Sequence, residues 1–130
     1  MIYLAIPYTG IEETSFSIAT LITGQLMKRG HPVFSPITHS HEVAKRTQLP
    51  TSWDYWEKVD HAFLDKCDEL LVVAIDGHHQ SVGVQAEQEY MRKSGKPVSF
   101  MWLDEEMSEL HNALFFVSHD KRFADLMIYN

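Results

Sequence analysis

The sequence predicts a single α/β domain in which helices cover a doubly wound, mainly parallel sheet. Short apolar runs typical of strands alternate with longer segments whose apolar residues recur at helical spacing. The run 69–75, "ELLVVAI", is apolar on both faces after its first residue, as a buried parallel strand must be. The 130 residues suffice for one hydrophobic core and not for two ordinary ones, so we expect one domain over 1–130.

Local signals define the elements of the first half. Residues 2–7, "IYLAIP", form a short apolar run that ends at a proline and predicts the first strand. Segment 12–30 has acidic residues in its first turn, basic residues in its last and a final glycine, which predicts a helix. Residues 31–36, "HPVFSP", predict the second strand. Residues 37–52 carry Pro, Ser, Thr and His without a sustained period, so we expect mainly loop.

The second half continues the alternation. Segment 52–68 has a serine suited to cap a helix and bulky apolar residues at helical spacing, which predicts an amphipathic helix. Segment 69–75 is the expected central strand, 81–95 the third helix and 96–103, "KPVSFMWL", the fourth strand. The tail, 104–130, predicts one or two further helices. We therefore expect about four parallel strands.

The expected strand order is 2-1-3-4, as in Rossmann-like sheets. In such a sheet the chain reverses direction between strands 1 and 3, and ligands bind at the carboxyl ends of these strands. Those ends carry "PYTG" at 7–10 and "DGHHQS" at 76–81. The sequence therefore predicts a ligand site between these two segments.

The segment "SVGVQAE", residues 81–87, begins the third helix at this predicted site. Free backbone N–H groups and the helix dipole favour an anion there; Ser81 can cap the helix or donate to a phosphate, and Gly83 permits close approach. Glu87 lies about 6 Å further along the same face, roughly the separation between a nucleotide 5′-phosphate and its anomeric carbon. A Ser-capped helix with a solvated glutamate is the alternative.

Asp60 lies in the middle of the second helix among bulky apolar residues. Two carboxylates facing one ligand can divide the work at an acetal-like carbon, one attacking or stabilising the cation and the other handling protons. We expect Asp60 and Glu87 to share a cavity in this way. An Asp60 directed to solvent is the alternative.

Composition excludes several classes of function. The formal net charge of −7 has the wrong sign for wrapping a nucleic-acid polymer, although backbone N–H groups can still bind a small anion. No apolar run is long enough to span a membrane, and no signal peptide pattern precedes the first strand. We therefore expect a cytoplasmic protein with no membrane partner.

Cysteine and histidine give no metal pattern. Cys67 is alone, which excludes a disulfide framework and a four-cysteine zinc site and favours a packing role. The pairs His39 and His41, and His78 and His79, lack the spacing of helical metal ligands. We expect neither a metal nor another cofactor.

Four segments resemble the nucleoside 2-deoxyribosyltransferase-like superfamily, which includes 2′-deoxynucleoside 5′-phosphate N-hydrolases, and look closest to a small branch of bacterial and phage domains. The segments are "YLAIPYTG", "GHPVFSPITHSH", "DHAFLDKCDELLVV" and "DGHHQSVGVQAEQEYMRKSGKPV". Together they span residues 1 to about 100 and leave the tail uncovered. The family pattern S-x-G-V-x-x-E is present at Ser81, Gly83, Val84 and Glu87.

The resemblance implies cleavage or transfer at the N-glycosidic bond of a deoxynucleoside or its 5′-monophosphate. Glu87 corresponds to the catalytic glutamate, Asp60 to the family's aspartate and Tyr8 to the aromatic residue after the first strand. The first loop lacks the arginine that some phosphate-binding members carry, so nucleoside and monophosphate both stay open. The candidate substrate contacts are Pro7, Thr9, Gly10, Asp76, Ser81, Gly83 and His39.

The resemblance also implies a homodimer or larger homo-oligomer, for which the apolar tail with Phe115, Phe116 and Met127 could supply a contact. A second hypothesis comes from a different class of protein. A nucleotide-binding sensor or regulator would keep the same crevice without turnover.

Overall fold

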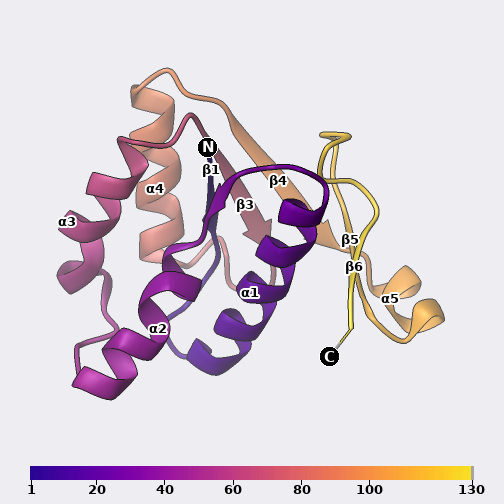
Figure 1. The fold of residues 1–130 in the computed structure, drawn as a ribbon, viewed down its shortest axis with the longest axis horizontal. Coiled ribbons are helices and arrows are strands. Elements are labelled where there is room, and N and C mark those ends of the chain that lie inside the picture. Colours follow the sequence, from indigo (N-terminus) through magenta and orange to yellow (C-terminus); the bar gives the residue numbers. More distant parts are fainter. Residues whose placement is uncertain (130) are drawn as a thin grey trace.

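The computed structural model describes residues 1–129, which form one six-stranded sheet with helices on both faces (Figure 1). The strand order is β2-β1-β3-β4-β5-β6; the first four strands along the chain pair in parallel, and the last two are antiparallel. The predicted fold class and the order 2-1-3-4 are thereby confirmed. The strands are β1 (Ile2–Ala5), β2 (Val33–Phe34), β3 (Glu69–Ala74), β4 (Val98–Leu103), β5 (Leu114–Val117) and β6 (Leu126–Ile128).

Two hydrophobic clusters fix the helices on opposite faces of the sheet. The long helix α1 packs on one face, and α3 and α4, which lie side by side in Figure 1, pack on the other. The short helix α2 contacts α1 and β1. The helices are α1 (Glu12–Lys28), α2 (Pro36–Thr47), α3 (Trp53–Leu64), α4 (Val82–Lys93) and α5 (Glu105–His111).

The alternation of β1 directs one polar group to the α3–α4 side. Ile2 and Leu4 join the cluster beneath α1, whereas Tyr3 and Ala5 join the cluster beneath α3 and α4, because successive side chains of a strand point to opposite faces. Tyr3 is completely buried. A buried tyrosine hydroxyl needs a hydrogen-bond partner, and this one has to find it under those two helices.

The expected loop at 37–52 is wrong, because α2 occupies most of it. The Ser35 side chain caps this helix by accepting a hydrogen bond from the Thr38 N–H, and Pro36 stands at the first helical position, where its missing N–H costs nothing. These are ordinary helix-start signals. The polar composition of the residues that follow obscures them in the sequence.

The predicted tail helices are also largely wrong, and the sheet has six strands where we expected about four. Only α5 forms; it ends at Asn112 in the left-handed conformation, and β5 and β6 follow as an antiparallel hairpin. Phe115 and Phe116 are buried inside the chain itself. They are therefore not available for the subunit contact that we expected of them.

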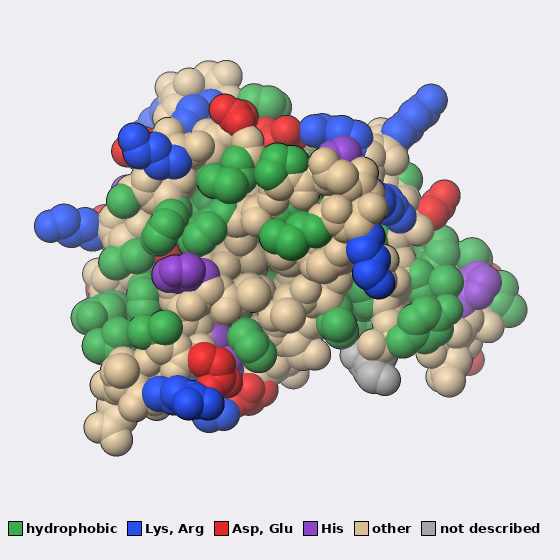
Figure 2. Space-filling view, in the orientation of Figure 1, with side chains coloured by type: hydrophobic (Ala, Val, Ile, Leu, Met, Phe, Trp, Pro, Cys, Tyr) green, Lys and Arg blue, Asp and Glu red, His purple; other side chains and the backbone are tan. Residues whose placement is uncertain are grey.

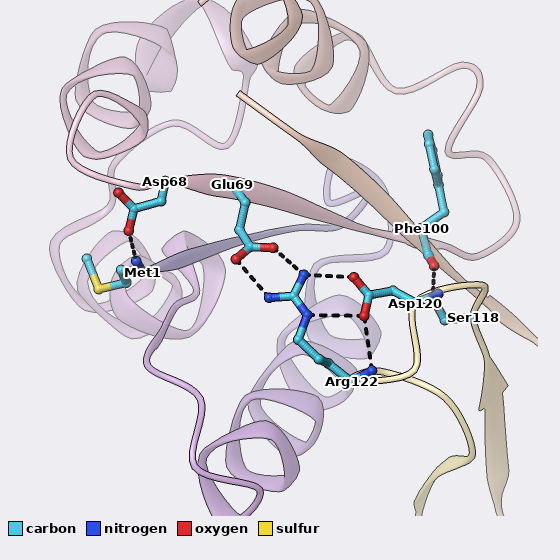
Figure 3. A network of polar contacts seen from close by, with 7 residues as sticks. All are labelled: Met1, Asp68, Glu69, Phe100, Ser118, Asp120 and Arg122. Atoms are coloured by element: carbon cyan, nitrogen blue, oxygen red, sulfur yellow. Dashed lines mark hydrogen bonds and ion pairs between the residues drawn. The ribbon is translucent and has the colours of Figure 1, made fainter. Parts of the chain in front are cut away.

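An ionic cluster fastens the tail to the sheet (Figure 3). The Arg122 guanidinium donates to Glu69 at the start of β3, at 2.6 and 2.9 Å, and to Asp120 at 2.7 and 3.1 Å. These two carboxylates raise the pKa of Arg122. Ser118 donates to the Phe100 carbonyl in β4. The tail thus extends the sheet on the side away from β2.

Across residues 1–129, no helix is long and apolar enough to cross a lipid bilayer.

Candidate active site

A cavity of about 640 Å³ opens where the carboxyl ends of β1 and β3 meet. The loops after these strands form part of its wall, and α2, α3 and α4 supply the rest. This volume falls in the range of small-molecule sites, and the position is the switch point between the two halves of the sheet. The cavity therefore lies where the strand order predicts a ligand site.

Most of the residues singled out in the sequence line this cavity. They come from the loop after β1, from α3, from the loop after β3 and from the start of α4. The lining residues among them are Pro7, Tyr8, Thr9, Asp60, Asp76, Ser81, Gly83 and Glu87.

Gly10 and His39 are not among the lining residues. Gly10 has φ +91° and forms the turn before α1, with its N–H directed to the Glu12 carboxylate. His39 is exposed, and its ring lies 5.6 Å from that of Phe34 between ring centroids. Because α2 is a helix, residues two apart lie on nearly opposite sides, so His41 lines the cavity and His39 does not.

Glu87 lies on the inner face of α4 and is only 5% exposed. The Tyr3 hydroxyl, from β1, donates a hydrogen bond to its Oε2 atom. Burial is the main cause that raises the pKa of Glu87 to about 8, and the charge of Asp60 is the second. The hydrogen bond from Tyr3 opposes the rise. The structure thus holds one carboxyl group in fixed orientation and makes its ionisation costly.

Asp60, on α3, is 8% exposed and lines the same cavity. Burial raises its pKa to about 7, and the nearby Tyr3 hydroxyl opposes this rise. Since the charge of Asp60 also raises the pKa of Glu87, the two carboxyl groups titrate as a pair. The expectation that Asp60 faces the ligand side, and not solvent, agrees with this placement.

The first turn of α4 is tightly packed. The Ser81 hydroxyl accepts the Val84 N–H at 3.2 Å, so it caps the helix. A Cβ atom on Gly83 would lie 3.0 Å from Cε3 of the Trp53 ring on α3. Gly83 therefore allows α3 and α4 to approach each other at the cavity wall.

Replacing Gly83 with Val is expected to lower the free energy of unfolding by about 1–3 kcal/mol, because the added methyl groups must displace the Trp53 ring. Urea unfolding measures the loss, and tryptophan fluorescence reports the ring. Gly24→Val is the matched control, since a Cβ at Gly24 in α1 meets nothing within 4 Å. Equal stability changes in the two variants would contradict the packing role of Gly83.

Sequence reasoning missed two polar residues of this region. Tyr3 lies inside an apolar strand, and its hydroxyl is the only feature of the sequence that could have marked it as a site residue. This hydroxyl donates a hydrogen bond to Glu87. His41 falls in a segment whose composition predicts a loop, yet it is 4% exposed, and its Nδ1 forms a hydrogen bond of 2.7 Å with the Tyr8 hydroxyl. Neither residue belongs to the quoted S-x-G-V-x-x-E pattern.

The remaining cysteine and histidines have other surroundings. Cys67 is buried in the cluster beneath α3 and α4, and burial raises the pKa of its thiol, as in an unreactive packing residue. The rings of His78 and His79 lie 3.8 Å apart between centroids, after β3. Within residues 1–129, no three His, Cys, Asp or Glu side chains are grouped so that they could hold a metal ion.

Comparison with known proteins places the chain in one family. No curated protein gives a match. The family model DUF1937, described as a domain of unknown function, matches residues 1–103, from the start of the chain to the end of β4. The matched range contains the whole cavity wall and leaves out α5 and the β5–β6 hairpin. The chain therefore belongs to the DUF1937 family.

Proposed function

We propose that the protein cleaves or transfers the N-glycosidic bond of a deoxynucleoside, with Glu87 as the nucleophile. One observation carries this proposal: a buried glutamate lines a cavity of ligand size, held by a tyrosine hydroxyl and accompanied by a second buried carboxyl group. The sequence resemblance to nucleoside 2-deoxyribosyltransferase-like proteins supports the same chemistry independently of this geometry.

In the proposed reaction, the Oε1 atom of Glu87 attacks the anomeric carbon, while Tyr3 holds Oε2. The C–N bond breaks, and its electron pair leaves with the base. Water or a second base then attacks the anomeric carbon of the glycosyl ester, with Asp60 accepting the proton of the attacking group; the bond from this carbon to Oε1 breaks, and Glu87 leaves as the carboxylate. No step requires an electron carrier.

The environment of Glu87 favours the transition state. Burial and the neighbouring Asp60 both make the carboxylate a high-energy anion. It therefore gains most when positive charge develops on the adjacent sugar ring, as it does in an oxocarbenium-like transition state. Tyr3 favours the ionised form that must attack.

The charges around the cavity favour a neutral substrate. Its lining includes four acidic residues and, among the described residues, no lysine or arginine. A phosphate would find backbone N–H groups at the start of α4 but no cationic side chain. The acidic lining residues are Asp54, Asp60, Asp76 and Glu87.

The net charge and its distribution agree with a small substrate. The formal net charge is −7, and on the face drawn in Figure 2 the Lys and Arg side chains lie at several separate places instead of forming one continuous patch. A nucleic-acid polymer would need such a patch. A homo-oligomer, implied by the resemblance, stays part of the proposal.

Incubation with a panel of deoxynucleosides and their 5′-monophosphates is expected to release free base from the deoxynucleosides at least about 10-fold faster, because the cavity lining offers a phosphate acidic side chains and no cationic one. Chromatography of the free base measures the rates. Adding a second free base separates transfer from hydrolysis. Faster release from monophosphates would contradict the assignment of a neutral substrate while keeping the glycosidic chemistry.

A nucleotide-binding sensor is the second candidate. It is favoured by the raised pKa values of Asp60 and Glu87, because a pair that retains protons near neutral pH can bind a ligand without attacking it. A sensor would give a thermal shift with a deoxynucleoside and no free base in the same panel.

A further inference from the structure

A chain of three side chains runs from the cavity wall to the protein surface. The Tyr8 hydroxyl lies 2.7 Å from Nδ1 of His41, and Nε2 of His41 lies 3.1 Å from Oε2 of Glu13. Tyr8 and His41 both line the cavity. His41 is 4% exposed, whereas the Glu13 side chain is 66% exposed. These three side chains therefore connect the cavity with solvent.

The partners of His41 fix its proton positions. An ionised carboxylate can only accept, so the imidazole Nε2 carries a hydrogen directed to Glu13. In neutral His41, Nδ1 carries no hydrogen and accepts a hydrogen bond from the Tyr8 hydroxyl. When His41 is doubly protonated, Nδ1 donates to the Tyr8 oxygen, and the phenol hydrogen is free to turn into the cavity. The same three residues thus have two hydrogen-bond arrangements.

The surroundings hold the side chains of Tyr8, His41 and Glu13 in place. The His41 ring stacks on Phe16 of α1, 4.4 Å between centroids, and meets the Tyr8 ring edge-on. Lys45 of α2 donates to Glu13 at 2.8 Å, and the hydrogen bonds from Lys45 and His41 lower the pKa of Glu13, which keeps it ionised. Burial, with Glu12 and Glu13 nearby, raises the pKa of Tyr8, so the phenol retains its proton for donation.

We propose that Glu13, His41 and Tyr8 form a proton relay that protonates the leaving group of the substrate bound in the cavity. The inference rests on the proposed function and adds a proton donor for the leaving base in the first step, where Glu87 acts as the nucleophile and Asp60 is assigned to the second step. The relay residues come from the loop after β1, from α1 and from α2, whereas Asp60 and Glu87 come from α3 and α4.

The relay step balances. As the C–N bond breaks, its electron pair moves to the nitrogen of the base, and the Tyr8 phenol gives its proton to that nitrogen. The Tyr8 oxygen takes the Nδ1 proton of doubly protonated His41, which becomes neutral. Glu13 stays ionised throughout, and His41 regains a proton from solvent. Tyr8 is the catalytic residue of this step, and His41 and Glu13 are positioning residues that act through it.

The test compares two substrates that differ in their need for a proton. The base of a natural deoxynucleoside leaves well only when protonated, whereas the nitrophenolate of a para-nitrophenyl deoxyriboside leaves as an anion. Tyr8→Phe and His41→Asn are expected to slow base release from the deoxynucleoside by about 100-fold or more and nitrophenolate release by less than about threefold. Tyr55→Phe removes a hydroxyl from an exposed tyrosine that does not line the cavity, and it is the matched control.

Each outcome decides between the proposals. Equal slowing of both substrates by Tyr8→Phe would overturn the relay alone and assign Tyr8 to binding. A wild-type protein that turns over neither substrate would overturn the proposed function and the relay with it. Should the buried His41→Asn variant fail to fold in a thermal melt, Glu13→Gln at the exposed end gives the same comparison, and unchanged rates in both Tyr8→Phe and Glu13→Gln would refute the relay.

Discussion

Replacing Glu87 with Gln is expected to leave a folded protein that still binds a deoxynucleoside but releases base at least about 1,000-fold more slowly. The amide keeps the shape of the side chain, and its oxygen can still accept the Tyr3 hydrogen bond. It carries no negative charge to attack the anomeric carbon or to stabilise the developing cation. Free base measured by chromatography, beside calorimetric binding and a thermal melt, separates the loss of chemistry from the loss of fold.

Glu89→Gln is the control for this experiment, because Glu89 lies on the same helix, is exposed and pairs with Lys93 at 2.9 Å. It is expected to retain the wild-type rate. Should Glu87→Gln keep a tenth of the wild-type activity or more, Glu87 would not be the nucleophile, and Asp60, the other buried carboxyl group of the cavity, would have to be tested next.

The sequence predicted the sheet around this site because its strands are short, apolar and separated by clear helices. It also predicted the helix that carries Glu87, since Ser81 and the glycine that follows are strong start signals. That Asp60 lines the same cavity as Glu87 depends on how α3 lies on the sheet. For that step the sequence offered only the apolar neighbours of Asp60 and its correspondence to the family's aspartate.

Helix α2 was missed for a physical reason. Its buried side includes His41 and Ala44, three residues apart, so one of the positions that face the protein interior is taken by a histidine. A pattern that counts only apolar residues does not find such a helix. The missed helix also explains why His39 and His41 were treated alike, since only helical geometry sends one to the cavity and the other to solvent.

The tail was predicted as helix because its apolar residues also fit a helical period. The run "LFFV" in β5 is short, and short apolar runs fit a buried strand equally well. The decisive contacts are distant in sequence, such as Arg122 with Glu69 (Figure 3). No local pattern contains them.

The stability of the protein is expected to fall as the pH rises from about 5 to 8. In the folded protein Asp60 and Glu87 have pKa values of about 7 and about 8, whereas in the unfolded chain they return to their ordinary values near 4. Between these limits the folded state binds more protons than the unfolded state, so a higher pH favours unfolding. A shift of about three units in one such group corresponds to about 4 kcal/mol.

Urea unfolding of the wild type and of Glu87→Gln at pH 5, 6, 7 and 8 measures this effect. The variant lacks one of the two buried acids, so its stability relative to the wild type is expected to rise steadily over this range. The difference between the two proteins cancels the titration of the shared groups that do not interact with Glu87, such as the exposed carboxylates; Asp60 is coupled to Glu87, and its changed titration is part of the measured difference. Glu89→Gln should show no such rise, because Lys93 lowers the pKa of Glu89 and an exposed carboxylate is already ionised across this range. A constant difference in the free energy of unfolding between wild type and Glu87→Gln from pH 5 to 8 would mean that Glu87 is ionised throughout. The Glu87 carboxylate would then not be the high-energy anion on which the proposed catalysis depends.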